Sequence, residues 1–427
     1  MELIALLVVF GVLMVLGVPV AVTMFGASIV YIMLNDTISL ANIATKVLSG
    51  VSGQSLLALP LYVMAGEIMN QAGITRKLFN LPMAFIGHIK GGLAHVNILA
   101  SMLFAGMSGA AIADTAGLGK IEMQAMEEEG YDTGFSAAVT AASSCIGPII
   151  PPSTTMIVYA VAAEVSVARL FMGGLVPGII MGLLMMAYVY FFSSRKYNLP
   201  TREKASAKER VKAVKEAILP CITPVIIILG ITTGITTATE SGALAVIYSV
   251  ALCYFYTRFN FKQFVEMIKT AGMTTVQICF IVCASALFGY VVTMARVPDI
   301  VADFMFNLGA SKWVILLLIN ICLLFLGCFL SITSAILIAT PTLVVLANMY
   351  GIDLVHLGVI ISLNLTIGLL TPPEGWNLYI VSGLAGISFE RMVKSVIPFL
   401  IPLIVSLLII TYCDQTVLWL PNLLFNK

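Results

Sequence analysis

The sequence predicts an all-α polytopic membrane protein of two inverted repeats, each with a re-entrant helical hairpin and a broken transmembrane helix. Three observations support this fold class. The 427 residues are 60% apolar and only 10% charged, far from the composition of soluble domains. Apolar stretches of about 20 residues, long enough to cross a bilayer, recur along the whole chain. Two Gly-x-x-x-Pro-Pro motifs, 147–152 and 368–373, interrupt such stretches.

The first apolar stretch and the central charged loop set the expected limits of the repeats. Only Met1 and Glu2 precede that stretch, unlike the basic start of a cleaved signal peptide, so we expect a spanning helix there. The segment 195–215 holds eight of the 22 Lys and Arg residues, and the positive-inside rule predicts a cytoplasmic loop. We expect a first repeat over 1–194, this basic loop over 195–216 and a second repeat over 217–427. The net charge of +1 argues against a nucleic-acid partner.

The two halves match without gaps when one is shifted by 221 positions, the distance from Pro151 to Pro372. Single matches of Leu or Gly are expected by chance in such a composition, but a shared register for several motifs is not. The shift aligns both prolines of each Pro-Pro pair, and it also pairs Gly147 with Gly368, Gly130 with Gly351, Asp132 with Asp353, Gly106 with Gly327 and Pro177 with Pro398. We infer an internal duplication.

Each half has the same expected order of elements, a hairpin followed by a broken helix. The hairpins are predicted at about 92–122 and 311–346, and the broken helices at about 133–163 and 355–383. The apolar arms His95–Ala105 and Trp313–Leu326 are roughly 11 and 14 residues long, against the 17 or more that a span needs. They are therefore predicted to be re-entrant. If each half crosses an odd number of times, the halves are inverted and both termini are periplasmic.

The repeated breaks predict binding sites. Paired broken helices in corresponding positions of two halves are typical of secondary transporters with sites at the membrane midplane. A break exposes carbonyl oxygens, which suit a cation, and amide groups, which suit a carboxylate. Neutral oxygen donors suited to Na⁺ gather at both tips and both breaks: Ser108, Thr115, Ser143, Ser144, Gly147, Ser153, Ser331, Thr333, Ser334, Asn364, Thr366, Gly368 and Thr371. The alternative is that each of them only allows helices to pack closely.

Intramembrane carboxylates are costly and by default are functional candidates. Asp114, Glu67, Glu240 and Glu374 qualify, although capping a helix end is an equal alternative for each. The predicted contacts to substrate are Asp114, Ser144, Ser153, Asn364 and Glu374. The second hairpin has Ala335 where the first has Asp114, so no symmetric pair of acidic cation sites is expected. No intramembrane chain of His and carboxylates is recognisable, which favours Na⁺ over protons as the driving ion.

The motifs are compatible with three other functions. Gly106–Gly109 matches the G-x-S-G of intramembrane serine proteases, but the three histidines lie near predicted helix ends and the nucleophile Ser108 needs a base within reach. No enzyme is therefore expected. Broken helices also line passive channels. A binding-protein-independent organic-anion exchanger is the third alternative.

Two segments are expected to be amphipathic helices in the membrane surface. The segment 261–270 places Phe261, Phe264 and Ile268 on one face with Lys262 and Glu266 elsewhere. The segment 76–90 is its predicted counterpart in the first half. Such arms are expected to brace a fixed frame against a moving core, and ordinary packing at the membrane surface is the alternative.

The whole chain resembles the large membrane subunit of the tripartite ATP-independent periplasmic (TRAP) transporters, and the resemblance leans toward the sialic acid branch. The motifs that carry it are SGAAIADTAGLG (108–119), GPIIPPS (147–153), GITTATESGALA (234–245) and GLLTPPEGWNL (368–378). It implies Na⁺-driven uptake of an organic acid, such as sialic acid or a C4-dicarboxylate, by an elevator motion across the bacterial inner membrane. No cofactor other than Na⁺ as coupling ion is implied.

The resemblance also implies partners and two sodium sites. The partners are a soluble periplasmic binding protein and a small membrane subunit of about four helices, expected here as a separate polypeptide because the chain starts at its first large-subunit helix. The first sodium site would combine Ser108, Gly109, Gly147, Pro148 and Pro151. The second would combine Ser331, Thr333, Ser334, Gly368 and Thr371. The second tip, FLSITS, is not a copy of the first. The resemblance therefore assigns the side-chain ligands of the second site less directly than its backbone ligands.

Overall fold

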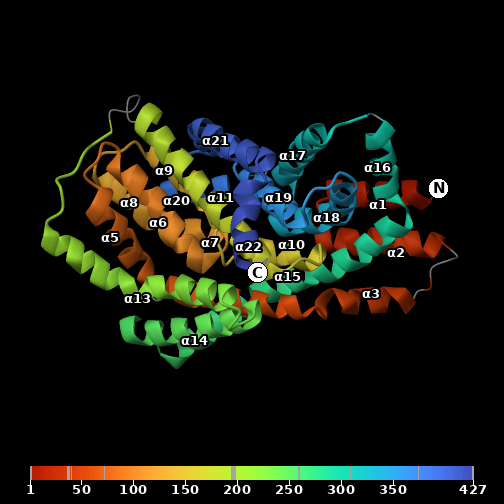
Figure 1. Cartoon of the computed structure of the whole chain (residues 1–427), viewed down its shortest axis with the longest axis horizontal. Coiled ribbons are helices and arrows are strands. Elements are labelled where there is room, and N and C mark those ends of the chain that lie inside the picture. The colour runs from red at the N-terminus through yellow and green to blue at the C-terminus, as the bar shows by residue number, and fades with distance from the viewer. Residues whose placement is uncertain are drawn as a thin grey trace.

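The computed structural model describes residues 2–35, 39, 41–71, 73–193, 199–257, 260–307, 309–373 and 375–425. Within these ranges every regular element is helical, which confirms the predicted all-α fold class. The molecule is elongated, with α1, α2 and α16 at one end and α5 and the start of α13 at the other (Figure 1). Seven of the described helices are long and apolar enough to cross a membrane, so the chain is a multi-pass membrane protein.

The helices of each half follow one another with short connections. The first half contains α1 (Glu2–Val15), α2 (Val20–Leu34), α3 (Ala41–Val51), α4 (Ala58–Gln71), α5 (Ile74–Ile86), α6 (Gly92–Ser108), α7 (Ala111–Asp114), α8 (Lys120–Glu128), α9 (Thr133–Ser143), α10 (Thr154–Ala162) and α11 (Val167–Tyr188). The second half contains α13 (Ala207–Thr232), α14 (Ala238–Thr257), α15 (Phe261–Met294), α16 (Val297–Asn307), α17 (Lys312–Phe329), α18 (Ile332–Met349), α19 (Leu354–Gly368), α20 (Trp376–Ala385), α21 (Phe389–Tyr412) and α22 (Gln415–Phe425).

The register of 221 residues recurs in the helix bounds. The arm α6 corresponds to α17, the segment from α7 to α8 corresponds to α18, and α9 corresponds to α19. Aspartates cap both broken helices in the same way: Asp132 accepts a hydrogen bond from the Phe135 amide, and Asp353 accepts from the Val355 and His356 amides. Both Pro-Pro peptide bonds are cis. The two halves therefore share one local architecture.

The two broken helices touch at equivalent positions. The Cys145 thiol contacts the Thr366 carbonyl at 3.6 Å, and these two residues are 221 positions apart. Such a contact places the axis that relates the halves between α19 and the end of α9. Both breaks therefore lie at the centre of the molecule.

The hairpin arms are longer than the apolar pattern predicts. The first arm, α6, has 17 residues and its equivalent, α17, has 18, and the second arm of the first hairpin continues to Glu128 rather than to about 122. The prediction of arms of about 11 and 14 residues was wrong, because small residues on either side of the apolar stretch, such as Gly92 and Gly106, continue the helix. Length alone does not make these arms too short to cross a membrane.

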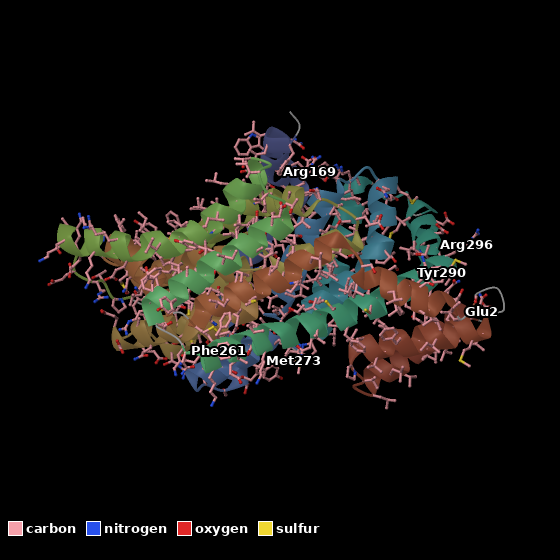
Figure 2. The ribbon with its side chains drawn as sticks, turned by 90° about the horizontal axis from the view of Figure 1, so that it is seen from below. Glu2, Arg169, Phe261, Met273, Tyr290 and Arg296 are labelled. Atoms are coloured by element: carbon pink, nitrogen blue, oxygen red, sulfur yellow. The ribbon has the colours of Figure 1, made fainter. Side chains whose placement is uncertain are left out.

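The segment 261–270 is not a separate surface helix. It forms the first turns of α15, which continues for 34 residues to Met294, or about 51 Å at 1.5 Å per residue. Figure 2 shows Phe261, Met273 and Tyr290 spread along this helix. In the 221-residue register its counterpart is α3 followed by α4, whereas α5, which covers most of 76–90, corresponds to α16. The pairing expected from sequence was therefore wrong, because amphipathic character alone was used to choose it.

Two groups of helices surround the breaks. One group packs α4 on α14 and α15 on α2, α3 and α4, and Figure 1 shows α13, α14, α3 and α15 along one edge of the molecule. The other group packs α9 on α21 and α17 on α19. One arm of each hairpin contacts the first group, because α6 packs on α4 and α18 packs on α15.

Candidate functional site

The tip of the first hairpin closes onto the first break. The helix α6 ends at Ser108, and Gly109 follows with a left-handed φ of 62°. The Thr154 amide and hydroxyl both donate to the Gly109 carbonyl, at 3.3 and 3.2 Å. A Cβ atom on Gly109 would collide with the Pro152 carbonyl oxygen, so no other residue fits here without movement. The tip and the break therefore form one structural unit.

The first break is a short non-helical segment with its own caps. After α9, a 3₁₀ turn covers Ser144–Ile146, and α10 begins only at Thr154. The Ser153 hydroxyl donates to the Pro148 carbonyl and accepts from the Met156 amide. Proline at 151 and 152 cannot supply the amide donors that would continue the helix. Carbonyl groups between α9 and α10 therefore lack the hydrogen bonds that they would accept in a continuous helix. Such free carbonyl groups are what a cation site requires.

The second hairpin meets the second break by a different contact. The Gly327 backbone lies directly against Gly368, and a Cβ on Gly368 would lie 2.6 Å from Gly327 backbone atoms. Beyond this contact the Thr371 hydroxyl donates to the Gly368 carbonyl at 2.8 Å and lies 3.0 Å from the Cys328 thiol. At the tip itself, Ser331 caps α18 and its hydroxyl lies 2.8 Å from that of Ser334.

One cavity of about 550 Å³ joins both tips and both breaks. Ser108 and Pro148 of the first predicted sodium site and Ser331 and Thr333 of the second line it. The Ser108 hydroxyl is buried and has no hydrogen-bond partner in the described structure. The other predicted sodium-site residues do not line the cavity: Gly109, Gly147, Pro151, Ser334, Gly368 and Thr371. The first predicted site thus has an unpartnered hydroxyl oxygen, whereas the hydroxyls of Ser331 and Ser334 in the second bond each other.

The predicted substrate contacts are mostly placed elsewhere. Asp114, Ser144, Ser153 and Asn364 are fully buried and do not line the cavity. Asn364, for example, donates to Asn320 at 2.7 Å. Glu374 lies outside the described residues. Polar groups that do line the cavity, and that sequence patterns did not single out, come from α4, α10, α15 and α20: Asn70, Thr154, Thr155, Thr274, Gln277 and Trp376.

Comparison with known proteins identifies the family. The sequence pattern described as "Tripartite ATP-independent periplasmic transporter, DctM component" matches residues 7–416. The chain belongs to the DctM family. The sialic acid TRAP transporter large permease protein of Vibrio cholerae is 39% identical over 95% of each chain, and the C4-dicarboxylate large permease protein of Pseudomonas aeruginosa is 36% identical over 90% of each. The sialic acid permease protein of Haemophilus influenzae is 37% identical over 98% of this chain and 68% of its own length.

A solved structure shares the fold of this DctM-family chain. The crystal structure of the YdaH transporter of Alcanivorax borkumensis superposes with a TM-score of 0.65 over 90% of each chain, at 12% sequence identity. At that identity the likeness concerns the helical architecture alone.

Asn377 connects the two repeats of this DctM-family chain and was missed in the sequence. Its side-chain amide donates to the Ser144 hydroxyl at 2.7 Å and to the Ala141 carbonyl at 3.2 Å, and its oxygen accepts from Thr115 at 2.8 Å. It therefore ties α20 of the second half to the hairpin and broken helix of the first. The signal for it was its place directly after the second break, in the motif at 368–378.

Replacing Asn377 with alanine should lower the free energy of unfolding by about 2 kcal/mol, since three buried bonds are lost at about 0.6 kcal/mol each in membrane proteins. The matched control is Ser382→Ala on the same helix, whose hydroxyl bonds only the Tyr379 carbonyl of its own helix. Thermal unfolding of both purified variants measures the difference. Equal effects of the two substitutions would show that the bridge to the first repeat contributes nothing.

The geometry excludes the protease interpretation, in agreement with a family of transporter components. Ser108 and His95 lie on one straight helix, thirteen residues or about 20 Å apart. His356 lies on α19, where its ring contacts the Ile410 carbonyl at 2.8 Å. His88 precedes α6, and none of the three rings forms a hydrogen bond with the Ser108 hydroxyl, which has no partner among the described residues. His95 is also buried, not interfacial as its position near the expected helix end suggested.

Proposed function

We propose that this chain is the transport subunit of a Na⁺-coupled symporter that takes up an organic acid of the sialic acid or C4-dicarboxylate class. The observation that carries the proposal is the cavity at which both hairpin tips meet both breaks. Relatives named for sialic acid and for C4-dicarboxylates are 36 to 39% identical to it over most of their lengths. A cavity of about 550 Å³ has room for either acid together with water.

The charge of the cavity supports coupling to a cation. Among the described residues that line it, none is basic, and Glu67 contributes a negative charge. An anionic substrate entering this cavity meets hydroxyls such as Ser108 and Thr154 but no compensating positive side chain. Na⁺ bound between tip and break would supply that charge, so substrate and ion would bind together more tightly than either alone.

The arrangement of helices supports an elevator motion. The hairpins and broken helices would move as one core against the frame that includes α4 and α15, whose residues line the other side of the cavity. We place the chain in the bacterial inner membrane, with the basic loop at 195–216 cytoplasmic and both termini periplasmic. No cofactor is required beyond Na⁺ as coupling ion.

Two partners complete the proposed transporter. A soluble periplasmic binding protein would deliver the substrate, and a separate small membrane subunit would cover part of the lateral surface. Large apolar side chains such as Leu16, Phe255 and Met273 are 65 to 77% exposed on that surface. Lipid and a membrane partner are the environments in which such exposure is stable.

Uptake into proteoliposomes tests the proposal. Vesicles containing this chain and its small subunit, supplied with binding protein, should accumulate sialic acid or a C4-dicarboxylate only under an inward Na⁺ gradient. An equal K⁺ gradient and omission of the binding protein are the controls. Accumulation without Na⁺ would contradict the coupling. Uptake without binding protein would indicate an exchanger, and flux that never exceeds equilibration would indicate a passive channel.

A further inference from the structure

The cavity between the tips and the breaks has one charged side chain among its described lining residues, the carboxylate of Glu67. Glu67 follows Gly66 on α4. A Cβ on Gly66 would lie 3.1 Å from the Met107 carbonyl oxygen and 3.4 Å from Ser108 backbone atoms, so α4 touches the tip of the first hairpin at this point. A ligand held at this tip therefore comes close to the Glu67 carboxylate.

The carboxylate belongs to a wall of hydrogen-bonding groups from α4 and α15, which pack on each other. Glu67 and Asn70 are neighbours on one face of α4, and Thr274 and Gln277 are neighbours on one face of α15. The Gln71 amide donates to one Glu67 oxygen at 2.6 Å. A carboxylate can accept about four hydrogen bonds, so Glu67 can accept more from a ligand. Carboxylate and amide groups together suit a ligand that carries several hydroxyl groups.

An aromatic ring lines the cavity on the side of the second break. Trp376 is the first residue of α20 and is 51% exposed. Its counterpart in the 221-residue register, Thr155, also lines the cavity, so this position faces the cavity in both halves. An indole ring offers a large, rigid, apolar surface with a polar edge. Such a surface packs well against the C–H face of a sugar ring.

These groups fit the two candidate acids differently. A sialic acid carries one carboxylate, several hydroxyl groups that can donate hydrogen bonds, and a ring with a C–H face. Succinate, a C4-dicarboxylate, carries two carboxylates on a short chain and has neither a hydroxyl nor a ring. With one carboxylate held beside Na⁺ at the tip, its second carboxylate would meet the like charge of Glu67, which costs binding energy. Its short chain would also leave much of the 550 Å³ cavity unfilled.

We infer that Glu67 and Trp376 make the site selective for a polyhydroxylated monocarboxylate, a sugar acid of the sialic acid type, over C4-dicarboxylates. Glu67 accepts hydrogen bonds from ligand hydroxyl groups and repels a second carboxylate. Trp376 packs against the ring of the ligand. The inference rests on the proposed function, because it narrows the substrate of the same cavity.

Direct binding to the membrane complex tests the inference without the selection that a binding protein adds. The purified complex of this chain and its small subunit is titrated with N-acetylneuraminic acid and with succinate, by calorimetry in saturating Na⁺. The wild type should bind the sialic acid about tenfold or more tightly than succinate. A wild-type preference for succinate would overturn the inference.

Glu67→Gln removes the charge but keeps the length of the side chain and an oxygen that can accept from Gln71. It should weaken sialic acid binding roughly tenfold and tighten succinate binding. The matched control is Glu266→Gln on α15, which removes an exposed carboxylate that pairs with Lys269 and does not line the cavity. Both affinities should be unchanged in the control. A ratio of the two affinities that Glu67→Gln leaves at the wild-type value would overturn the inference.

Trp376→Leu keeps an apolar side chain but loses the ring. It should weaken sialic acid binding about tenfold and change succinate binding little. The melting temperature without ligand checks that each variant is folded. Equal loss of affinity for the two acids would overturn the role given to the ring.

Uptake into proteoliposomes separates this inference from the proposed function. If uptake is Na⁺-driven but the complex prefers succinate, the selectivity is wrong while the coupling stands. If Glu67→Gln removes a clear preference for the sialic acid, yet wild-type uptake needs no Na⁺, the coupling is wrong while the selectivity stands. If the complex binds neither acid, both the inference and the proposed function are wrong.

Discussion

Replacing Gly109 with alanine should abolish uptake. The residue has a left-handed φ of 62°, and its added Cβ would collide with the Pro152 carbonyl oxygen. The left-handed conformation costs about 1 kcal/mol for alanine and the overpacking about 2 kcal/mol more, so the closed tip would be about 100-fold less populated. Uptake of labelled substrate by proteoliposomes measures the loss, with size-exclusion chromatography to check folding.

Gly351→Ala separates the cost of the left-handed backbone from the cost of the collision with Pro152, which Gly109→Ala combines. Gly351 has the same φ of 62°, but no atom lies within 4 Å of the Cβ that alanine would add. This variant should lose about 1 kcal/mol of stability and keep its uptake. If Gly109→Ala transports as well as Gly351→Ala, contact between the first tip and the first break is not needed for transport.

Gly368→Ala should disrupt the second half by separating α17 from α19. Three Gly327 backbone atoms lie 2.6 to 2.8 Å from the position of the new Cβ, and backbone cannot rotate away as a side chain can. We expect a loss of about 3 kcal/mol in the free energy of unfolding together with loss of uptake. Thermal unfolding and uptake are measured on the same preparation.

The control for Gly368→Ala is Gly383→Ala on α20, where no atom lies within 4 Å of the new Cβ. A helical position of this kind should become slightly more stable, by roughly 0.5 to 1 kcal/mol. Normal stability and uptake of Gly368→Ala would show that the close approach of the hairpin arm to the second break has no role.

Motifs that repeat in register predicted the architecture well. Gly-x-x-x-Pro-Pro and the capping aspartates at 132 and 353 act locally, through missing amide donors and bonds to the next helical turn, so their effect is visible in the sequence. They place both breaks and the helices around them. The contact of Cys145 with Thr366 then follows from the symmetry rather than from either residue alone.

Features set by packing between distant segments could not be predicted. Asn377 bonds Thr115 and Ser144, both more than 230 positions away, and nothing near it in the sequence indicates these partners. Glu122 lies in a segment so rich in charge that it resembles a solvated helix, although it is buried. Arm lengths were underestimated because small residues were counted as helix ends. In the first arm these are residues such as Gly92 and Gly106, which lie inside α6.

The Na⁺ dependence of uptake by Ser108→Ala tests the central claim, that a cation held between tip and break drives transport. Ser108 offers a buried hydroxyl without a partner at the cavity. Loss of one ligand, worth about 1.4 kcal/mol, should raise the Na⁺ concentration for half-maximal uptake about tenfold. The control Ser362→Ala removes a buried, equally unpartnered hydroxyl that does not line the cavity, and should leave that concentration unchanged. A Ser108→Ala transporter with normal expression and wild-type Na⁺ dependence would contradict the account.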